Sequence, residues 1–343
     1  MRDLVALTEK IIGWTICIGF VLVAAWCLQG YRTYGLVAWK SWPVMIVGNE
    51  VIYSPILHAL RDSIFSPVFY ALFAGILLFE RFFPADPQQR IFSPSLATDA
   101  VWLFATAITN ATIQVTYVAF LQWIYHRYFD FLTVHDLNAM SATMRFVFAV
   151  VLIDLLNWTH HYIRHKIPIF WEFHTIHHSQ KHLNMFTDLR YHVVEYLVSH
   201  TVWTIPFLVL EIDLPQIVWY IMFTTWYSRV YHSNIKSNYG LLRYVFVTPQ
   251  SHRVHHSVLP QHRDKNFGVI FSIWDRMFGT QYKGYEEYPP TGVEDEHFPH
   301  EDELKSSLKS LLLAPFVQMV YPFYKLTYAK VNDLEETRNK IQK

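Results

Sequence analysis

The sequence predicts an all-α integral membrane protein with about 4–6 transmembrane helices in hairpins and a cytoplasmic helical cap that carries a histidine-rich site for two metal ions. Three observations lead to this prediction. The chain is 52% hydrophobic and only 16% charged, whereas about a quarter of the residues in a soluble protein are charged. Long runs carry no charged residue, and histidines recur in three groups at helical spacing.

The net charge and the cysteine content exclude other classes of protein. The formal net charge is +0 at pH 7, which gives no electrostatic reason to expect nucleic acid as a partner. Both cysteines, Cys17 and Cys27, lie in one apolar run. We therefore expect neither a disulfide framework nor a thiolate metal site, and metal chemistry must rest on histidine.

Residues 1–145 predict an N-terminal transmembrane region. Residues 11–31 carry no charge and are long enough to cross a bilayer core of about 30 Å as a helix, rather than to serve as a cleaved signal peptide. Residues 34–63 are mixed and aromatic, which is typical of the membrane interface. Residues 64–79 and 101–125 are apolar runs on either side of a polar loop, which predicts a transmembrane hairpin.

The histidine groups fall within residues 146–282, which we expect to form the catalytic domain. Residues 146–158 are apolar and lead directly into the first group. Between the second and third groups, residues 196–210 and 214–227 are apolar and flank a turn at residues 211–215, as expected for a helical hairpin. Because the hairpin returns the chain to the side that it left, all three groups can meet at one face of the membrane.

Three histidine boxes carry the candidate chemistry. Spacings of three and four residues place the imidazoles of each box on one face of a helix. The boxes comprise His161 and His165, then His174, His177 and His178, and finally His252, His255 and His256. Four ligands fill a tetrahedral zinc site, so these eight imidazoles predict two metal ions side by side.

Two other classes of metalloenzyme fit the sequence poorly. Zinc proteases carry HExxH or the inverted HxxEH motif. The first is absent, and the second is nearly met by His192 and Glu195 but has Tyr196 at its last position. Soluble di-iron proteins use Glu-x-x-His pairs, which are missing at these boxes. An all-histidine set remains, and imidazole alone suits iron, copper, zinc and nickel.

Residues 146–282 resemble the fatty acid hydroxylase and sterol desaturase superfamily of integral-membrane, non-haem di-iron oxygenases. The order and spacing of the boxes carry this resemblance, together with matches between and after them. These matches are Asp154, Ser179, the pattern Thr187-x-x-Arg190-x-His192-x-x-Glu195, the sequence His232-Ser233-Asn234, the pair Asn266 and Gly268, and WDRMFGT at residues 274–280.

The resemblance implies two Fe2+ ions, with O2 as co-substrate, held by nine histidines, because the family often adds one ligand before the third box. The implied ligands are His161, His165, His174, His177, His178, His232, His252, His255 and His256. The resemblance also implies five residues that surround the ligands, namely Asp154, Arg190, His192, Glu195 and Asp275. A carboxylate there would hold the second ring nitrogen of a ligand, although Asp154 could equally pair with Arg190. Other histidines, such as His160 and His182, are expected outside the site.

The implied activity is the hydroxylation or desaturation of a lipid, such as a sterol or a fatty acyl or alkyl lipid. The chain has no HPGG, CxxCH or GxGxxG motif, so we expect electrons from a separate ferredoxin- or cytochrome b5-type protein. The sequence leaves open a non-catalytic, histidine-rich metal-binding membrane protein or a metal transporter. Transport sites normally lie at mid-membrane on broken helices, whereas these boxes lie at the ends of apolar runs.

The flanking charges and the C-terminal tail complete the predicted topology. Lysine and arginine outnumber acidic residues in residues 160–192 and 229–265, which by the positive-inside rule places the site on the cytoplasmic face. A bacterial inner membrane is favoured over the endoplasmic reticulum, since the chain lacks a lysine-rich retrieval tail. Residues 283–343 form a tail in which residues 312–324 are expected to lie at the membrane interface as a helix.

Overall fold

The computed structural model divides into two compact units, Met1–Pro84 and Ala85–Lys343. The predicted span at residues 11–31 lies outside the described residues, apart from Ile18. The structure describes residues 67–89, 94–109, 115–135, 139–301 and 312–327, together with Ile18 and the two short strands at residues 45–47 and 50–52.

The first unit holds a small antiparallel sheet and an apolar helix. Strand β1, Met45–Val47, pairs with β2, Glu50–Ile52. These strands lie within the aromatic stretch for which the sequence predicts no strand, so the expectation of an all-α chain is wrong at this hairpin. Helix α3, Pro67–Phe82, confirms the helix predicted for residues 64–79. It begins at a proline, whose missing N–H would have no partner in the first turn.

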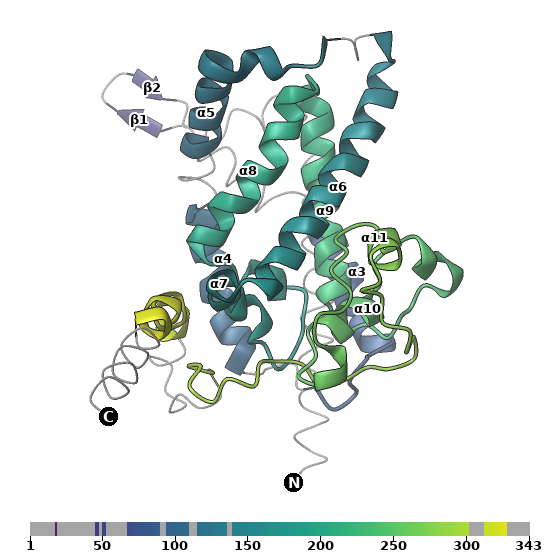
Figure 1. Cartoon of the computed structure of the whole chain (residues 1–343). Coiled ribbons are helices and arrows are strands. Elements are labelled where there is room, and N and C mark those ends of the chain that lie inside the picture. Colours follow the sequence, from purple (N-terminus) through teal and green to yellow (C-terminus); the bar gives the residue numbers. More distant parts are fainter. Residues whose placement is uncertain are drawn as a thin grey trace, which may run out of the picture. The chain divides into compact units, whose positions relative to one another are not determined.

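The second unit contains the elements that carry the histidine boxes. Figure 1 shows α6 and α8 running side by side, with α7, α10 and α11 toward one end of them. The described elements of the second unit are α4 (Pro94–Thr109), α5 (Val115–Ile124), η2 (Tyr125–Phe129), η3 (Asp130–Leu132), α6 (Ala142–Lys166), α7 (Pro168–His178), η5 (Thr187–Leu189), α8 (Val193–Val209), α9 (Leu214–His232), η6 (Gly240–Tyr244), α10 (Pro249–His255), η7 (Pro260–His262), α11 (Ile273–Met277) and a helix at residues 312–327.

The apolar run at residues 101–125, for which we predicted a single span, includes most of one described helix, α4, and all of another, α5. α4 ends at Thr109 and α5 begins at Val115, and residues 110–114 lie outside the described residues. The two helices have different neighbours, because α4 packs against η5 and α5 packs against α8. An uncharged run indicates an apolar setting, but it does not indicate which neighbour each part will meet.

Helix α6 is the main candidate for a membrane span. It has 25 residues, and among the described residues it is the helix that is long and apolar enough to cross a membrane. The Ser141 side chain caps it by accepting a hydrogen bond from the backbone N–H of Met144. Val147, Phe148 and Val151 are exposed on its first half. The sequence predicts 4–6 membrane spans, and the described residues contain one helix that is long and apolar enough to be a span.

Helices α8 and α9 confirm the hairpin predicted from the two apolar runs. Glu211 in the intervening turn has a positive φ of 49°, which lets the chain reverse direction. Ile153 of α6, Phe207 of α8 and Tyr220 of α9 belong to one buried core. Burial of each such side chain stabilises the fold by roughly 1.5–3 kcal/mol, so this core fixes the hairpin against α6.

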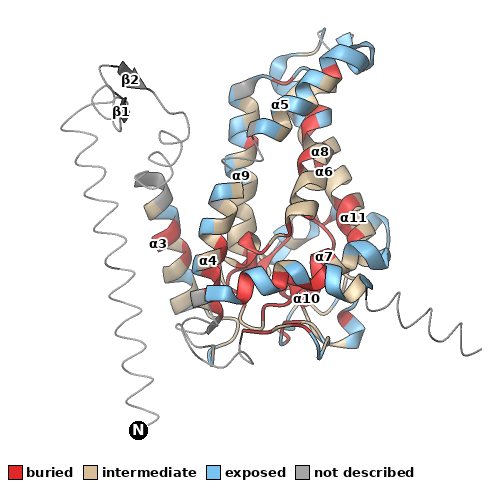
Figure 2. Cartoon of the chain, turned by 90° about the vertical axis from the view of Figure 1, so that its left-hand side faces the viewer, coloured by how far each residue is buried: buried red, intermediate tan, exposed pale blue. Residues whose placement is uncertain are grey.

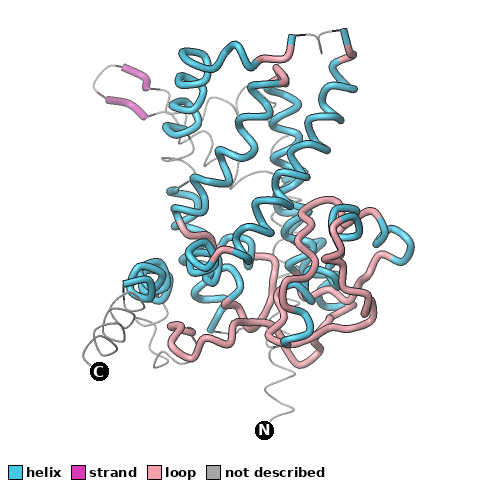
Figure 3. Tube along the Cα trace, in the orientation of Figure 1, coloured by secondary structure: helices cyan, strands magenta, loops and turns pink. Residues whose placement is uncertain are grey.

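The end of the unit that carries the boxes is built largely from loops, which surround α10 and α11 in Figure 3. Buried residues gather in this region, around α7 and α10 (Figure 2). The helix at residues 312–327 confirms the helix expected in the tail. Gln318 and Tyr321 are buried on it, while Phe316, Val320 and Phe323 are exposed.

Candidate metal centre

The nine histidines named from the sequence converge in two clusters. Within each cluster, one ring nitrogen of every residue lies within 4.8 Å of those of the others. Both clusters draw on the second and third boxes, so the boxes do not correspond to separate sites. The five-histidine cluster contains His161, His165, His174, His178 and His255, and the four-histidine cluster contains His177, His232, His252 and His256.

The local structure brings these side chains together through helix ends. The first box lies in the last turns of α6, and the single residue Ile167 joins α6 to α7. Pro168 starts α7 and contributes no N–H to the ladder, so the chain bends there and the second box faces the first. His232 ends α9. Helix α10 begins with a capping box between Thr248 and Ser251, which fixes the direction of the third box.

Hydrogen bonds to the second ring nitrogen determine the tautomer of several histidines. The Nδ1 atoms of His161 and His255 lie 2.9 and 2.8 Å from the carbonyl oxygens of Phe267 and Lys265. A carbonyl oxygen only accepts hydrogen bonds, so these Nδ1 atoms carry the proton and Nε2 keeps its lone pair. His232 makes the same kind of bond, 2.8 Å long, to the carbonyl of Ser228.

The Nε2 atoms of the five-histidine cluster fit a metal ion. All five are buried and have no hydrogen-bond partner among the described residues. Each buried polar atom without a partner costs about 1–3 kcal/mol, so five of them around one point are unfavourable unless they share a cation. Nitrogen ligands without carboxylate are compatible with iron, copper, zinc or nickel.

The four-histidine cluster fits a second metal ion. The Nε2 atom of His232 lies 3.1 Å from Nε2 of His177 and 2.8 Å from Nε2 of His252. Because His232 carries its proton on Nδ1, a lone pair on its Nε2 faces the neighbouring rings. Lone pairs at this separation repel each other unless a proton or a cation lies between them.

Burial keeps the imidazoles neutral, as ligation requires. It lowers the pKa of His255 to about 4. Burial, together with the neighbouring imidazoles, also holds the pKa of His178 and His252 well below the ordinary value of histidine. Near pH 7 these rings therefore present lone pairs rather than protons toward the centre of each cluster.

Among the implied outer residues, Glu195 contacts a clustered histidine. Its carboxylate oxygen lies 2.5 Å from Nδ1 of His174 and 2.7 Å from the guanidinium of Arg164. Both carboxylate partners are buried. Glu195 therefore orients His174 and is itself held in place by a buried cation.

Asp154 and Asp275 hold a loop rather than a ring nitrogen, which differs from the expectation for a carboxylate beside a ligand. Asp275 accepts hydrogen bonds of 2.8 Å from the backbone N–H groups of Phe267 and Gly268. Asp154 accepts bonds from the backbone of Ile270 and Phe271. The two carboxylates therefore act on the clusters indirectly. They hold the loop whose Phe267 carbonyl contacts His161.

Arg190 and His192 lie outside both clusters. Arg190 is fully buried and lies 2.7 Å from both Asp99 and Glu301, so the alternative pairing of Arg190 with Asp154 is wrong. Arg190 and Asp154 belong to separate hydrogen-bond networks. The His192 side chain caps α8 by accepting a hydrogen bond from the N–H of Val194, and its Nε2 lies 3.1 Å from the carbonyl of Met319.

Sequence reasoning missed Arg164 and Tyr191, which link the surroundings of the two clusters. Arg164 donates to the Tyr191 hydroxyl over 3.1 Å, besides its ion pair with Glu195. The Tyr191 ring lies 5.3 Å from the ring of His177, between centroids. His160, which we expected outside the site, lies against the Arg164 guanidinium. The available signal was Arg164, a charged residue between the two histidines of the first box.

Glu195→Gln is expected to lower metal affinity about 10- to 100-fold. Glutamine has the same shape but no charge, so it accepts more weakly from His174 and leaves the buried Arg164 without its ion pair. Competition with a chelator would measure the change. The matched control is Glu172→Gln on α7, whose carboxylate pairs with Lys325 at 3.0 Å. Equal affinities for Glu195→Gln and wild type would rule out this role.

Gly268→Ala is expected to destabilise the fold by about 1–3 kcal/mol, because a methyl group does not fit. An added Cβ would lie 2.8 Å from both the Phe271 carbonyl oxygen and Cγ2 of Val247. The loop must then move, and with it the carbonyl that holds His161. We expect a lower Tm and less bound metal. Gly75→Ala is the control, since a Cβ there has nothing within 4 Å; an unchanged Tm for both would contradict the packing argument.

Comparison with known proteins identifies similarity in the segment that carries the clusters. Residues 146–280 match the family model described as "Fatty acid hydroxylase". The chain is 27% identical over 259 residues to ornithine lipid hydroxylase OlsE of Rhizobium tropici, which covers 73% of this chain and 76% of that protein. No solved structure matches the chain.

Alkylglycerol monooxygenases are similar over a shorter region. Identity is 35% over 130 residues with the protein of Danio rerio and 32% over 130 residues with that of Homo sapiens. Each match covers 37% of this chain and 28% of the relative. The chain thus matches little more than a quarter of the length of these relatives.

Proposed function

Residues 146–280 make this chain a member of the fatty acid hydroxylase superfamily, and from that membership we propose that the protein is a membrane-bound, O2-dependent oxidoreductase that oxidises a C–H bond of a lipid. The observation that carries the proposal is the pair of buried histidine clusters, five and four residues in size. A zinc site that only stabilises a fold needs four ligands, so nine convergent imidazoles support a two-metal centre instead.

We assign one Fe2+ ion to each cluster. When bound, the iron pair supplies the O2 activation that no protein side chain can provide. The protein residues contribute orientation and protection. The carbonyls of Phe267 and Lys265 keep His161 and His255 in the tautomer that binds metal, and Glu195 does so for His174. Eight of the nine clustered histidines are buried, and His165 is partly buried. This burial restricts the access of water to the place where a substrate carbon would react.

The placement of the clusters supports a substrate from the membrane. The first box ends α6, a helix long enough to cross a bilayer. Exposed apolar side chains lie on α6 at Phe148 and on α9 at Trp219 and Phe223, as expected for surfaces that meet lipid. Lysine and arginine around the boxes favour the cytoplasmic face. We propose a bacterial inner membrane over the endoplasmic reticulum for this topology.

The proposed substrate is a fatty acyl or alkyl lipid, with a sterol as the alternative within the same reaction class. The names of the relatives, an ornithine lipid hydroxylase and alkylglycerol monooxygenases, favour lipids with a polar head. Hydroxylation is favoured over desaturation for the same reason. Electrons are expected from a separate ferredoxin- or cytochrome b5-type protein.

Metal analysis combined with isotope-labelled O2 tests this function. The full chain, purified in lipid nanodiscs, would be assayed for iron and zinc, then supplied with reduced ferredoxin, labelled O2 and lipids extracted from the expression host. We expect about two irons per chain and a lipid product that carries labelled oxygen.

The outcomes separate the proposed function from its rivals. An unsaturated lipid with the label in water would identify a desaturase of the same class. A single zinc per chain with no lipid product would refute the oxidoreductase and favour the non-catalytic metal-binding protein. Metal uptake into sealed vesicles, without lipid oxidation, would favour the transporter.

A further inference from the structure

Exposed apolar side chains gather where η6 lies against α11. The Leu241 side chain is 81% exposed, and that of Met277 is 64% exposed. A group of large apolar side chains at the surface marks a place that contacts a membrane, a protein or a ligand. We call this surface the η6–α11 patch, and its exposed members are Leu241, Leu242, Tyr244, Val245, Met277 and Phe278.

Hydrogen bonds join the two segments of the patch into one surface. The backbone N–H of Ser272, next to the start of α11, donates to the carbonyl of Val245 over 2.9 Å. The Ser272 hydroxyl donates to the carbonyl of Arg243 over 2.8 Å. Phe246 and Phe271 pair in the antiparallel manner of two strands. η6 is therefore fixed to α11, and the patch is one surface rather than two separate loops.

The patch adjoins the helix that we propose to span the membrane. The Phe278 ring stacks on that of Trp158 in α6, with centroids 4.6 Å apart, and Nε1 of Trp274 donates to Asp154 over 2.8 Å. Trp158 comes 16 residues after Ala142, the first residue of α6, which is about 24 Å along the helix axis. The hydrocarbon core of a bilayer is about 30 Å thick. In a membrane-spanning α6, the patch therefore lies near the cytoplasmic headgroups.

Two arginines lie within the patch, and each stacks on a tyrosine. Cζ of Arg243 lies 4.5 Å from the centre of the Tyr285 ring. Cζ of Arg276 lies 4.6 Å from the centre of the Tyr244 ring. Arg276 also donates to the Tyr285 hydroxyl over 3.3 Å and to the Arg243 carbonyl over 3.2 Å. Because a ring face attracts a guanidinium, both cations are held beside the same two rings.

Both guanidiniums lack an ion pair within the described part of the chain, unlike the buried Arg164 and Arg190. Asp275 points toward backbone N–H groups, and Glu286 accepts a hydrogen bond from Asn238 over 2.7 Å. Two like charges held side by side repel each other, and an anion that bridges them relieves this repulsion. Phosphate oxygens match the planar fork of guanidinium donors.

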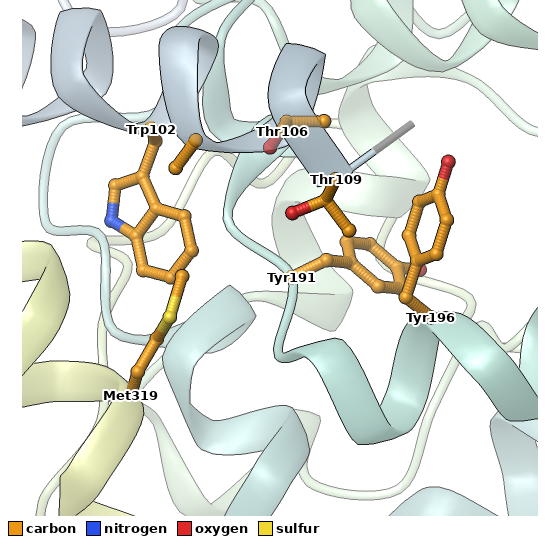
Figure 4. A pocket seen from close by; sticks show the side chains of 7 residues that line it. Trp102, Thr106, Thr109, Tyr191, Tyr196 and Met319 are labelled. Carbon is orange, nitrogen blue, oxygen red and sulfur yellow. The ribbon is translucent and has the colours of Figure 1, made fainter. Parts of the chain in front are cut away.

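The crevice between α4 and Tyr191 is a poorer candidate for a ligand of this kind. Figure 4 shows Trp102, Thr109 and Tyr191 among the side chains that line it. It has room for about one water molecule, so neither a headgroup nor a hydrocarbon chain fits. Arg243 and Arg276 are instead partly exposed at the surface, where a large ligand can approach them.

We propose that the η6–α11 patch binds an anionic phospholipid of the surrounding membrane. The lipid phosphate accepts hydrogen bonds from Arg243 and Arg276, and the acyl chains lie along Leu241, Leu242 and Met277. This lipid is a structural ligand rather than the substrate, so the inference goes beyond the proposed function and rests only on its membrane location. A lipid bound there holds the end of the unit that carries the histidine clusters at the level of the headgroups.

Native mass spectrometry of the full chain in detergent tests the site without turnover. The protein would be titrated with phosphatidylglycerol and, separately, with phosphatidylcholine that has the same acyl chains. We expect phosphatidylglycerol to bind at least about tenfold more tightly, because its headgroup carries a net negative charge. Higher ionic strength should weaken this preference, since part of the attraction is screened.

Matched variants locate the binding. Arg243→Gln should weaken phosphatidylglycerol binding about tenfold, which corresponds to about 1.4 kcal/mol of binding free energy. Arg263→Gln removes an exposed cation that pairs with Glu294 instead, and it should leave binding unchanged. Leu241→Asp places a negative charge on the most exposed side chain of the patch and should also weaken binding. Metal content and Tm confirm that the variants are folded.

The outcomes distinguish this inference from the proposed function. Equal binding of the two lipids, or wild-type phosphatidylglycerol affinity in both Arg243→Gln and Leu241→Asp, would overturn the site. Inorganic phosphate that binds as tightly as phosphatidylglycerol would assign the arginines to a free anion and also overturn it. Lipid oxidation without a preference for phosphatidylglycerol would refute this site alone. A clear preference in a protein that holds no iron and oxidises no lipid would refute the oxidoreductase and leave this site standing.

Discussion

His177→Ala is expected to lower lipid oxidation at least about 100-fold and to reduce iron from about two per chain to about one or less. His177 belongs to the four-histidine cluster, where its Nε2 lies 3.1 Å from that of His232. Loss of a residue that only orients a ligand costs about 10- to 100-fold, so loss of a ligand should reach at least the upper end of that range.

Iron quantification and product analysis on the same preparation would measure both effects. His182→Ala is the matched control, because His182 lies four residues after His178 and yet belongs to neither cluster. It should keep wild-type iron and activity. Wild-type iron content in His177→Ala would show that the four-histidine cluster does not hold a metal.

Arg190→Met is expected to be the most destabilising change outside the clusters. It leaves Asp99 and Glu301 buried without the cation that lies 2.7 Å from each. Removing one partner of a buried ion pair costs about 3–5 kcal/mol, and in a domain of this size 1 kcal/mol corresponds to about 2–4 °C in Tm. We therefore expect Tm to fall by roughly 10 °C. Arg263→Met, at an exposed pair with Glu294, should change Tm little.

The pH dependence of this loss has a definite sign. In the wild type, Arg190 holds the pKa of Glu301 at about 2 against the effect of burial. The ionised Glu301 carboxylate therefore stabilises the fold fully above pH 4.5, and this contribution is lost only as the pH falls toward 2. Without Arg190 both carboxylates take up protons at higher pH, and protonation removes the buried charge. The Tm difference from wild type should therefore narrow between pH 7 and pH 5, and a constant difference would contradict the charge argument.

The sequence predicted what depends on local spacing. Boxes at i, i+3 and i, i+4 identified eight of the nine clustered histidines, and the resemblance added His232. The hairpin of α8 and α9 followed from two apolar runs and a turn. Each of these is a property of neighbouring residues, and such properties are visible in a linear sequence.

The sequence did not predict what depends on long-range packing. The division of the boxes between two clusters requires the crossing of α6, α7 and α10. The acceptors of His161 and His255 are backbone carbonyls, which leave no trace in residue identity. Arg190 pairs with Asp99 and Glu301, which lie 91 and 111 residues away, and both lie outside the segment that resembles the family.

The way in which the boxes are shared between the clusters would affect how the protein acquires the two metal ions that we propose. Helix α7 contributes His174 and His178 to the five-histidine cluster and His177 to the four-histidine cluster. The third box contributes His255 to the first of these and His252 and His256 to the second. A metal bound in one cluster therefore positions the helix that completes the second. Incorporation should be cooperative, with chains that carry a single ion as a minor species. Assembly of the centre and final folding of this region then become one process, and chelation should loosen α7 and the third box together.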